Sequence, residues 1–560
     1  MDDGAVFYIN GVEVYRTNIT GTPKSTTPAD TDVVYPKFSS SIEIPASAVV
    51  PGTNVLAVEL HQHPSGTTDA FLMAQLDMIE TPAPPNYTVR LQLNEIASAT
   101  APSWFVELRN TSSSAVNLTG WTLSSSTGTT YSLTGSVAAG ALLSLDQATL
   151  GWRPPDGAKI FLSAPGSSVE GAVVKLAAQA RDASGRWRTP SAPTAGTSNT
   201  FSIPDSIVIN EIMYNHAPVF LPTGSTPNAE EWIELYNKSS SPVVLTGWKV
   251  RGGVSFDFTA GTTIPAGGYL VVANDAPALL AKFPGITVVG PLGGSLSNSD
   301  DLITLEDGTD NVVNEVHYFE GGRWDERADG GGGSLELRNP GMDNTVPEAW
   351  AASDETSKSS WQTFTYTGLG APPPGSNDPI QYNELVMGLL DKGECLIDDV
   401  SVLDVTSGSI QLIQNSNFSA GTATAWRNIG NHGSHGRTVV VDDPSSPGNK
   451  VLKVVATSAT EHMHNHLETT LKNGASYVAL NSANTYAVSF RARWLSGSPR
   501  LNSRLYFNRL ARTSLLPMPQ NNGTPGAQNS RFVALAGPTC TALSHSPVLP
   551  QASAAVTVSV

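Results

Sequence analysis

The sequence predicts an all-β protein built from tandem β-sandwiches. Gly and Pro together account for 50 + 39 = 89 of the 560 residues, and only 14% of the residues are charged. Segments of alternating apolar and polar residues are separated by turn-forming residues at intervals of roughly ten. This composition suits many short strands and disfavours long helices. At about 100–200 residues per domain, the length predicts roughly three to five domains.

Charge and cysteine content exclude several classes of protein. The formal net charge is 32 − 49 = −17, which repels the phosphate backbone, so we expect no nucleic-acid partner. We find no run of about 18 apolar residues and therefore expect no membrane span. Cys395 and Cys540 are too few for a disulfide scaffold or a cysteine-based zinc module.

Residues 1–80 are expected to form a separate unit. Asn10-Gly11 lies between two strand-like segments and predicts a hairpin turn, and 52–62 is an alternating strand. Together these segments resemble the second half of the galactose-binding-like jelly rolls that accompany secreted sugar-active enzymes. The first half is absent and no signal peptide precedes the hairpin. We therefore expect a fragment of a longer exported protein, with its export signal in the missing N-terminal part.

Two copies of one domain follow. Three motifs occur in the same order in both copies: an Asn-Glu-Ile strand, a Trp-bearing strand that ends in Asn, and Leu-Thr-Gly-Trp. They lie at 93–96, 104–110 and 118–121 in the first copy and at 209–212, 232–237 and 245–248 in the second. The alternating apolar residues predict strands with one face in the core and the other solvated. Each copy is expected to be a β-sandwich of about 100 residues.

These motifs resemble the bacterial lamin tail domain, an immunoglobulin-like β-sandwich. The match is stronger for the second copy, 205–345, because 268–273, 296–305 and 333–337 resemble later strands of the family. It is weaker for the first copy, 88–200. The resemblance implies rigid adhesion or tethering modules in large secreted proteins, which often also carry a spore-coat-type kinase domain. Nothing in this sequence resembles that kinase.

Residues 346–516 resemble a carbohydrate-binding jelly roll. Its closing strands, 360–402, precede its opening strands, 412–494, so we expect a single circularly permuted jelly roll. About 60 residues of closing strands could not bury a core alone. The resemblance implies a polysaccharide or cell-surface glycan as partner, with exposed aromatic, Arg or His side chains on a concave sheet. Residues 517–560, rich in Pro, Gly, Asn and Ser at first, are expected to be a linker and the start of a missing module.

Two sites of metal ligation are candidates. Asp398 and Asp399 lie where jelly rolls of this kind often hold a structural calcium, although Ser419 replaces the acidic residue expected at a third position. The alternative is a pair of solvated or turn-bonding carboxylates. The second candidate is a histidine cluster, in which alternating residues would share one strand face and could bind zinc or copper. Its members are His432, His435, His462, His464 and His466. The alternative is a polar strand face or a ligand groove.

Other motifs favour structural roles. The repeated pairs Asn94-Glu95 and Asn210-Glu211 are expected to satisfy loop amides within each sandwich. The glycine run 330–333 lacks the context of a phosphate cradle. We find none of the common motifs of a catalytic nucleophile or metalloprotease.

The sequence as a whole predicts a non-catalytic, secreted or cell-surface protein for adhesion, tethering and glycan binding. Two alternatives remain open. One is a metal-dependent enzyme that uses the histidine cluster at 432–466. The other is a purely structural surface protein without a ligand.

Overall fold

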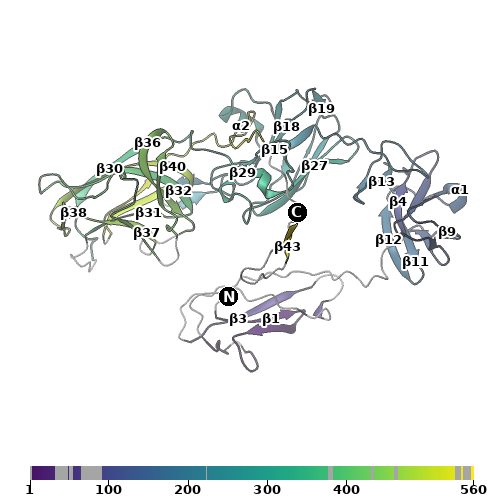
Figure 1. Ribbon diagram of the computed structural model, residues 1–560, viewed down its shortest axis with the longest axis horizontal. Helices are drawn as coiled ribbons and strands as arrows, with labels where there is room; N and C mark the ends of the chain where they lie inside the picture. The colour runs from purple at the N-terminus through teal and green to yellow at the C-terminus, as the bar shows by residue number, and fades with distance from the viewer. Residues whose placement is uncertain are drawn as a thin grey trace. The chain divides into compact units, whose positions relative to one another are not determined.

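The structure, a computed structural model, describes residues 3–24, 26–31, 44, 48–49, 54–64, 91–221, 224–375, 383–430, 434–459, 465–506, 508–535, 544–546 and 557–559. The chain divides into two compact units, Met1–Thr88 and Val89–Val560. Nearly all regular structure is β, and the strands form several sheets (Figure 1). The predicted class, all-β with tandem sandwiches, is confirmed.

The first unit contains a three-stranded antiparallel sheet in the order β2-β1-β3. Its strands are β1 (Gly4–Ile9), β2 (Val12–Thr17) and β3 (Leu56–His61). Asn10 and Gly11 form the turn between β1 and β2 with φ of 53° and 79°, the positive values that a two-residue hairpin turn requires. The predicted Asn-Gly hairpin is therefore present.

The first sandwich of the second unit packs a five-stranded sheet, β10-β5-β4-β13-β14, with a four-stranded sheet, β12-β11-β7-β8. Leu93, Val106 and Ile160 belong to one buried core between them. The elements are β4 (Leu91–Ile96), β5 (Phe105–Asn110), β6 (Val116–Asn117), β7 (Thr122–Ser125), β8 (Thr130–Ser132), β9 (Ser136–Val137), β10 (Leu142–Asp146), α1 (Gln147–Leu150), β11 (Lys159–Ala164), β12 (Ser167–Val173), β13 (Gln179–Arg181) and β14 (Trp187–Arg188).

The second sandwich repeats this plan with a six-stranded sheet, β24-β23-β18-β15-β28-β29, and a five-stranded sheet, β25-β21-β20-β26-β27. Ile212, Ile233 and Ile303 lie in the core. The elements are β15 (Ile207–Met213), β16 (Val219–Leu221), β17 (Gly224–Thr226), β18 (Trp232–Asn237), β19 (Val243–Val244), β20 (Lys249–Arg251), β21 (Val254–Asp257), β22 (Thr263–Ile264), β23 (Tyr269–Ala273), α2 (Ala276–Lys282), β24 (Val288–Val289), β25 (Gly293–Gly294), β26 (Asp300–Glu306), β27 (Val312–Phe319), η3 (Glu326–Ala328), β28 (Leu335–Leu337), η4 (Pro347–Ala349) and β29 (Trp350–Ala352).

The third sandwich is formed by residues 362–515. One sheet has the order β30-β40-β32-β36-β35, with β33 on β32, and the other has the order β34-β37-β31-β41-β42. The strands are β30 (Gln362–Leu369), β31 (Glu384–Leu389), β32 (Gly393–Asp404), β33 (Ile410–Gln411), β34 (Trp426–Ile429), β35 (Val439–Asp443), β36 (Ser446–Ala456), β37 (His466–Thr470), β38 (Lys472–Asn473), β39 (Ser476–Tyr477), β40 (Thr485–Gly497), β41 (Arg500–Leu505) and β42 (Arg509–Leu515).

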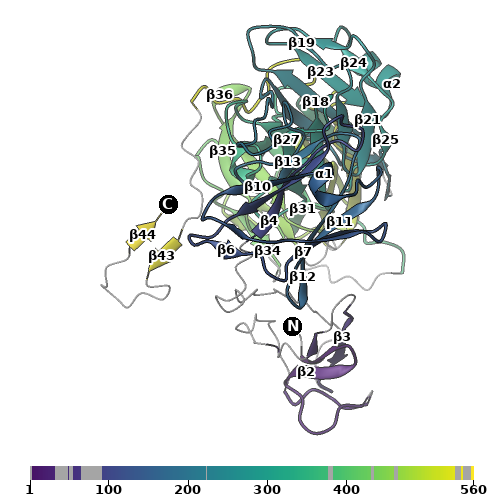
Figure 2. The same ribbon diagram turned by 90° about the vertical axis from the view of Figure 1, so that its right-hand side faces the viewer.

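The two halves of the third sandwich share one core. Met387 and Ile397, from the strands before residue 405, pack in the same cluster as Leu452 and Phe490 from the later strands. The structure therefore does not show two sheets with separate cores, the result that would have refuted a single domain. The permuted jelly-roll topology stays a prediction. Farther along the chain, β43 (Ser544–Ser546) and β44 (Thr557–Ser559) form a two-stranded ribbon (Figure 2).

Candidate functional site

Three glutamates lie side by side on the six-stranded sheet of the second sandwich. Glu234 of β18, Glu211 of β15 and Glu336 of β28 are register partners on neighbouring strands, and all three are fully buried. Because strand residues alternate between faces, these carboxylates lie on the face of the sheet that points away from the core residues Ile212 and Ile233. The prediction that this face is solvated is wrong, because another part of the chain covers it.

The cover is a strap formed by residues 521–533. Its backbone and side chains donate hydrogen bonds to every carboxylate of the row, which satisfies groups that would otherwise be buried without partners. The bonds run from Thr524 N to Glu211 Oε1 (2.8 Å), from Gly526 N to Glu234 Oε2, and from Ser530 Oγ and Arg531 N to Glu336 Oε2 (2.9 and 2.8 Å).

Asparagine side chains anchor the end of the strap. Asn529 Nδ2 donates to the Asn210 carbonyl at 2.9 Å and to the Leu337 carbonyl at 2.8 Å. In return, Asn210 Nδ2 donates to Asn529 Oδ1 at 2.8 Å and to Glu234 Oε1 at 2.8 Å. The strap is thereby held to β15 through side-chain hydrogen bonds between residues 319 positions apart.

The first sandwich has the same arrangement. The equivalent bonds run from Thr194 N to Glu95 Oε1 (3.0 Å), from Gly196 N to Glu107 Oε2 (2.5 Å) and from Asn199 Nδ2 to the Asn94 carbonyl (3.4 Å). Thr-x-Gly-x-x-Asn is therefore a shared closing motif, at 194–199 in the first copy and 524–529 in the second. The expectation that these pairs satisfy loop amides is confirmed for Glu95 and Glu211. The Asn94 and Asn210 side chains instead donate to Glu107 and Glu234.

The expectation that 517–560 is a linker is wrong for the strap. Its polar composition, which indicated a linker, instead supplies donors for buried carboxylates. In the first copy the closing motif follows the sandwich directly. In the second copy, residues 362–515 come between β29 and the closing motif, and this separation hid the motif in the sequence.

Burial governs the charge state of the glutamates. The pKa of Glu234 is raised to about 8, chiefly because burial disfavours the carboxylate. The pKa of Glu211 is also raised well above its usual value by burial, and the neighbouring charges of Glu336 and Glu234 add to the effect. Hydrogen bonds from Gly526 and Thr524 act in the opposite direction. Glu211 and Glu234 therefore retain protons at a pH at which exposed glutamates are ionised.

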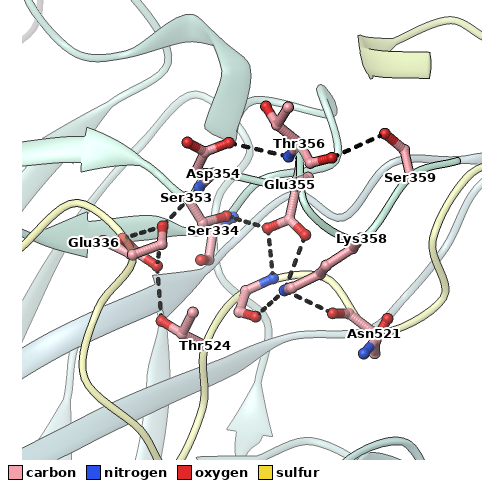
Figure 3. Close-up of polar contacts among 12 residues, drawn as sticks. Ser334, Glu336, Ser353, Asp354, Glu355, Thr356, Lys358, Ser359, Asn521 and Thr524 are labelled. Carbon is pink, nitrogen blue, oxygen red and sulfur yellow. Dashed lines mark hydrogen bonds and ion pairs between the residues drawn. The ribbon is translucent and has the colours of Figure 1, made fainter. Parts of the chain in front are cut away.

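Polar contacts, here called the clamp, join the two segments of the chain that connect the second and third sandwiches, 355–358 and 521–523 (Figure 3). Lys358 Nζ donates to the carbonyls of Asn521, at 2.8 Å, and of Gly523. It also lies 3.0 Å from Glu355 Oε2, and Glu355 Oε1 accepts the Gly523 N–H at 2.9 Å. The segment that leaves the second sandwich is thus bound to the segment that returns to it.

The glycine run 330–333 has a packing role beside this clamp. A Cβ on Gly332 would lie 2.7 Å from Trp494 of the third sandwich, and Gly332 has a φ of 96°. The Gly497 N–H donates to the Gly331 carbonyl at 2.7 Å. Small residues are needed because an indole and a backbone segment approach the chain closely.

The third sandwich presents a polar face on β34, β37, β31 and β41. The residues that point into the core alternate with an outward row, which includes Arg427, Glu384, Glu468, Asn502 and Arg504. Arg427 Nε lies 2.5 Å from Glu468 Oε1, and its NH2 lies 3.5 Å from Glu384 Oε1. Burial lowers the pKa of Arg504 to about 10.

Several buried polar atoms on this face have no hydrogen-bond partner among the described residues. They are His435 Nδ1, His466 Nδ1 and Asn465 Oδ1. His435 Nε2 accepts the Leu389 N–H at 3.1 Å, and His466 Nε2 lies 3.2 Å from Glu468 Oε2. Each imidazole thus uses one nitrogen and leaves the other unpaired, although both residues are at most 3% exposed. Such atoms cost free energy unless a ligand or water satisfies them.

The structure brings together two members of the histidine cluster. A Cβ on Gly388 would lie 3.1 Å from His435 Nε2 and 3.6 Å from the Cα of His466. The pKa of His435 is lowered to about 4 by burial, with a further contribution from His466. His432, His462 and His464 lie outside the described residues. Within the described part of the chain, no group of three metal-ligating side chains could hold an ion.

Asp398 and Asp399 have an arginine as counter-ion. Arg491 NH2 lies 2.7 Å from Asp398 Oδ2, and Arg491 Nε lies 2.7 Å from Asp399 Oδ2. Asn449 Nδ2 also donates to Asp398 at 3.1 Å, and the guanidinium stacks 4.9 Å from the ring centroid of Trp361. A Ca²⁺ at these carboxylates would have to displace the guanidinium, and calcium stays a prediction.

Two tryptophans of the third sandwich do not belong to an exposed aromatic platform. Trp426 and Trp494 are 8% and 0% exposed and belong to the core. The second sandwich instead has a shallow hollow of about 540 Å³, lined in part by Phe319, Asp300 and Arg323. Phe319 is 43% exposed there.

Sequence reasoning singled out His466 on a polar strand face but missed its neighbours Asn502 and Arg504 in the outward row of the third sandwich. The available signal was the period-two spacing of polar residues in two strands, His466-x-Glu468 and Asn502-x-Arg504. None of the helices in the described ranges is long and apolar enough to cross a membrane.

Comparison with known proteins supports the assignment of the second sandwich. Residues 202–320 match the Lamin Tail Domain family. The lamin tail domain thus covers most strands of the second sandwich but ends before β28 and the strap. No curated protein matches the chain.

Two solved structures show weak similarity. A DUF4876 family protein from Bacteroides thetaiotaomicron is 12% identical, with a TM-score of 0.14, and the match covers 35% of this chain and 64% of that one. The surface glycan-binding protein PbSGBP-B from Prevotella bryantii is 8% identical, with a TM-score of 0.11, and the match covers 73% of this chain and 98% of that one. The chain therefore spans less than two thirds of the length of the first.

Proposed function

We propose that this chain is a non-catalytic modular protein, secreted or on the cell surface, that binds a glycan through its third sandwich. In this proposal the third sandwich is a carbohydrate-binding jelly roll, and the first two sandwiches, including the lamin tail domain, are rigid adhesion or tethering units. The partner is a polysaccharide or a cell-surface glycan.

The observation that carries the proposal is the exposed charged network on the polar face. The Arg427 side chain is 42% exposed and pairs with Glu468 and Glu384. Sugar hydroxyls both donate and accept hydrogen bonds, so they could bond to this guanidinium and to these carboxylates. Charged donors and acceptors form stronger hydrogen bonds than neutral groups.

A glycan array probed with the full chain tests this proposal. We expect Arg427→Ala to weaken binding to the glycan class selected by the unaltered chain at least about tenfold, because a charge-assisted hydrogen bond contributes about 1.5–3 kcal/mol. Arg251→Ala is the matched control, since Arg251 forms an exposed ion pair with Asp257 in the second sandwich. Unchanged binding by Arg427→Ala, together with lost binding by Phe319→Ala, would move the site to the hollow of the second sandwich.

The two alternatives make different predictions. A metal-dependent enzyme requires stoichiometric zinc or copper, which elemental analysis of the purified chain would detect. A purely structural protein binds no glycan on the array. The geometry favours glycan binding over both, because the polar face carries an exposed charged network around Arg427.

A further inference from the structure

We propose that the third sandwich is inserted into the second sandwich and that the strap keeps the inserted domain out of the path of tension along the chain. The proposal goes beyond glycan binding and concerns how such a binding unit would be held under load. It rests on contacts among described residues.

The first step is that the closing motif of the first sandwich, 194–199, forms the same contacts as the strap of the second. In each sandwich a Thr-x-Gly-x-x-Asn motif delivers a Thr N–H, a Gly N–H and an Asn side chain to the same positions of the sheet. The strap is therefore a part of the second sandwich, although residues 362–515 separate it from β29. An insertion accounts for this separation.

The second step is that the two segments connecting the second and third sandwiches lie close together. Insertion is tolerated where the ends of the inserted domain lie close together. Lys358 and Glu355, before the third sandwich, bind Asn521 and Gly523, after it. The ends of the inserted domain are thus fastened to each other.

The third step concerns tension applied to the chain on either side of the second sandwich. β15 begins at Ile207 and is bound to the strap through the mutual bonds of Asn210 and Asn529. Val533 N donates to the Arg338 carbonyl at 2.8 Å farther along the strap. Tension that enters at β15 therefore crosses to the strap directly, and the third sandwich carries none until the strap detaches.

Single-molecule pulling of the full chain tests this inference without any ligand. Handles are attached at Asp205→Cys and Leu535→Cys, where the side chain of Asp205 is 95% exposed and Leu535 is 89% exposed, in a Cys540→Ser background. We expect a short detachment event first. A lengthening of roughly 500 Å from residues 360–516, at about 3.3–3.6 Å per residue, should follow it and never precede it.

Variants of the strap and of the closing motif in the first sandwich distinguish the contributions of the two sandwiches. Asn529→Ala should make detachment about tenfold faster at constant force, since buried hydrogen bonds are lost. Asn199→Ala, at the equivalent position of the first sandwich, lies outside the handles and should change nothing. Ser530→Ala removes a hydroxyl that donates to Glu336 and accepts the Asp354 N–H. It should act in the same direction as Asn529→Ala and replaces it if that variant does not fold. Lengthening of the third sandwich before detachment, or detachment unaffected by the folded strap variant, would overturn the proposal.

Discussion

The buried carboxylate of Glu234 gives the second sandwich a measurable pH dependence. Its pKa in the folded chain is about 8, against about 4.5 for an exposed glutamate. The folded state therefore binds more protons than the unfolded state between these values. The resulting stabilisation is complete below about pH 4.5 and is lost as the pH rises through about 8.

Scanning calorimetry at pH 5.5 and 8.5 tests this prediction. The transition of the second sandwich should lie a few °C lower at pH 8.5, and Glu234→Gln should reduce the difference because it removes the ionisable group. Glu315→Gln is the control, since Glu315 belongs to β27 and forms a partly exposed ion pair with Arg186. An equal pH response in the chain and in Glu234→Gln would show that Glu234 does not titrate as described.

The pKa shift of His435, in the third sandwich, has the opposite effect on stability. Its pKa is lowered to about 4 from about 6.5, so its stabilisation is present above about pH 6.5 and is lost as the pH falls toward 4. Calorimetry between pH 7 and 4 should show the third sandwich losing stability, and His435→Gln should lessen the loss. If the stability of His435→Gln changed with pH as steeply as that of the unaltered chain, the result would contradict a buried neutral imidazole.

The roles of individual residues were only partly predictable, because their partners are often distant in the sequence. The structural role of the Asn-Glu pairs followed from their repetition, but the partners of Asn210 and Glu211 lie more than 300 positions away. The charge of Asp398 and Asp399 indicated a cation, and the cation in contact is the Arg491 guanidinium from a neighbouring strand. Pairing between distant strands decides such contacts, and a single sequence does not reveal it.

At the scale of elements, the glycine run couples two sandwiches. Gly332→Ala should weaken their packing, because its Cβ would meet the Trp494 ring at 2.7 Å. Gly322→Ala is the matched control: Gly322 also has a positive φ, 73°, but no atom lies within 4 Å of its Cβ position. Both variants carry backbone strain, so the difference between them reports on the close contacts with Trp494 and, at 3.2 Å, Asn522 Nδ2.

Urea unfolding measures this difference. Gly332→Ala should lose about 1–3 kcal/mol more than Gly322→Ala, the range for overpacking a tight contact. Equal losses in the two variants would mean that the Trp494 contact contributes nothing to stability.

Strands were predictable as elements, but their environments were only partly so. The alternation in β18 predicted one core face correctly and assigned the other to solvent, although Trp232 and Glu234 are covered by the strap. Alternation identifies the two faces of a strand and does not show whether a distant segment covers the polar one.

At the scale of the whole molecule, the inserted arrangement predicts how the chain tolerates truncation. A chain ending at residue 360 contains the family match at 202–320 and β29 but lacks the strap, so its buried glutamates lose their donors. We expect this truncated second sandwich to be unfolded or severely destabilised. Removal of 362–515 alone, with a short Gly-Ser link, keeps the strap and should preserve the fold. Hydrogen exchange over 207–237 measures both outcomes, and equal protection in the two chains would contradict the account.

The central claim is that the chain holds a glycan without altering it. Affinity electrophoresis of the full chain in gels that contain the polysaccharide selected on the array, followed by sizing of that polysaccharide, tests the claim directly. We predict retarded migration, weaker retardation for Arg427→Ala, and an unchanged polysaccharide length. Unretarded migration, or release of shorter fragments, would contradict it.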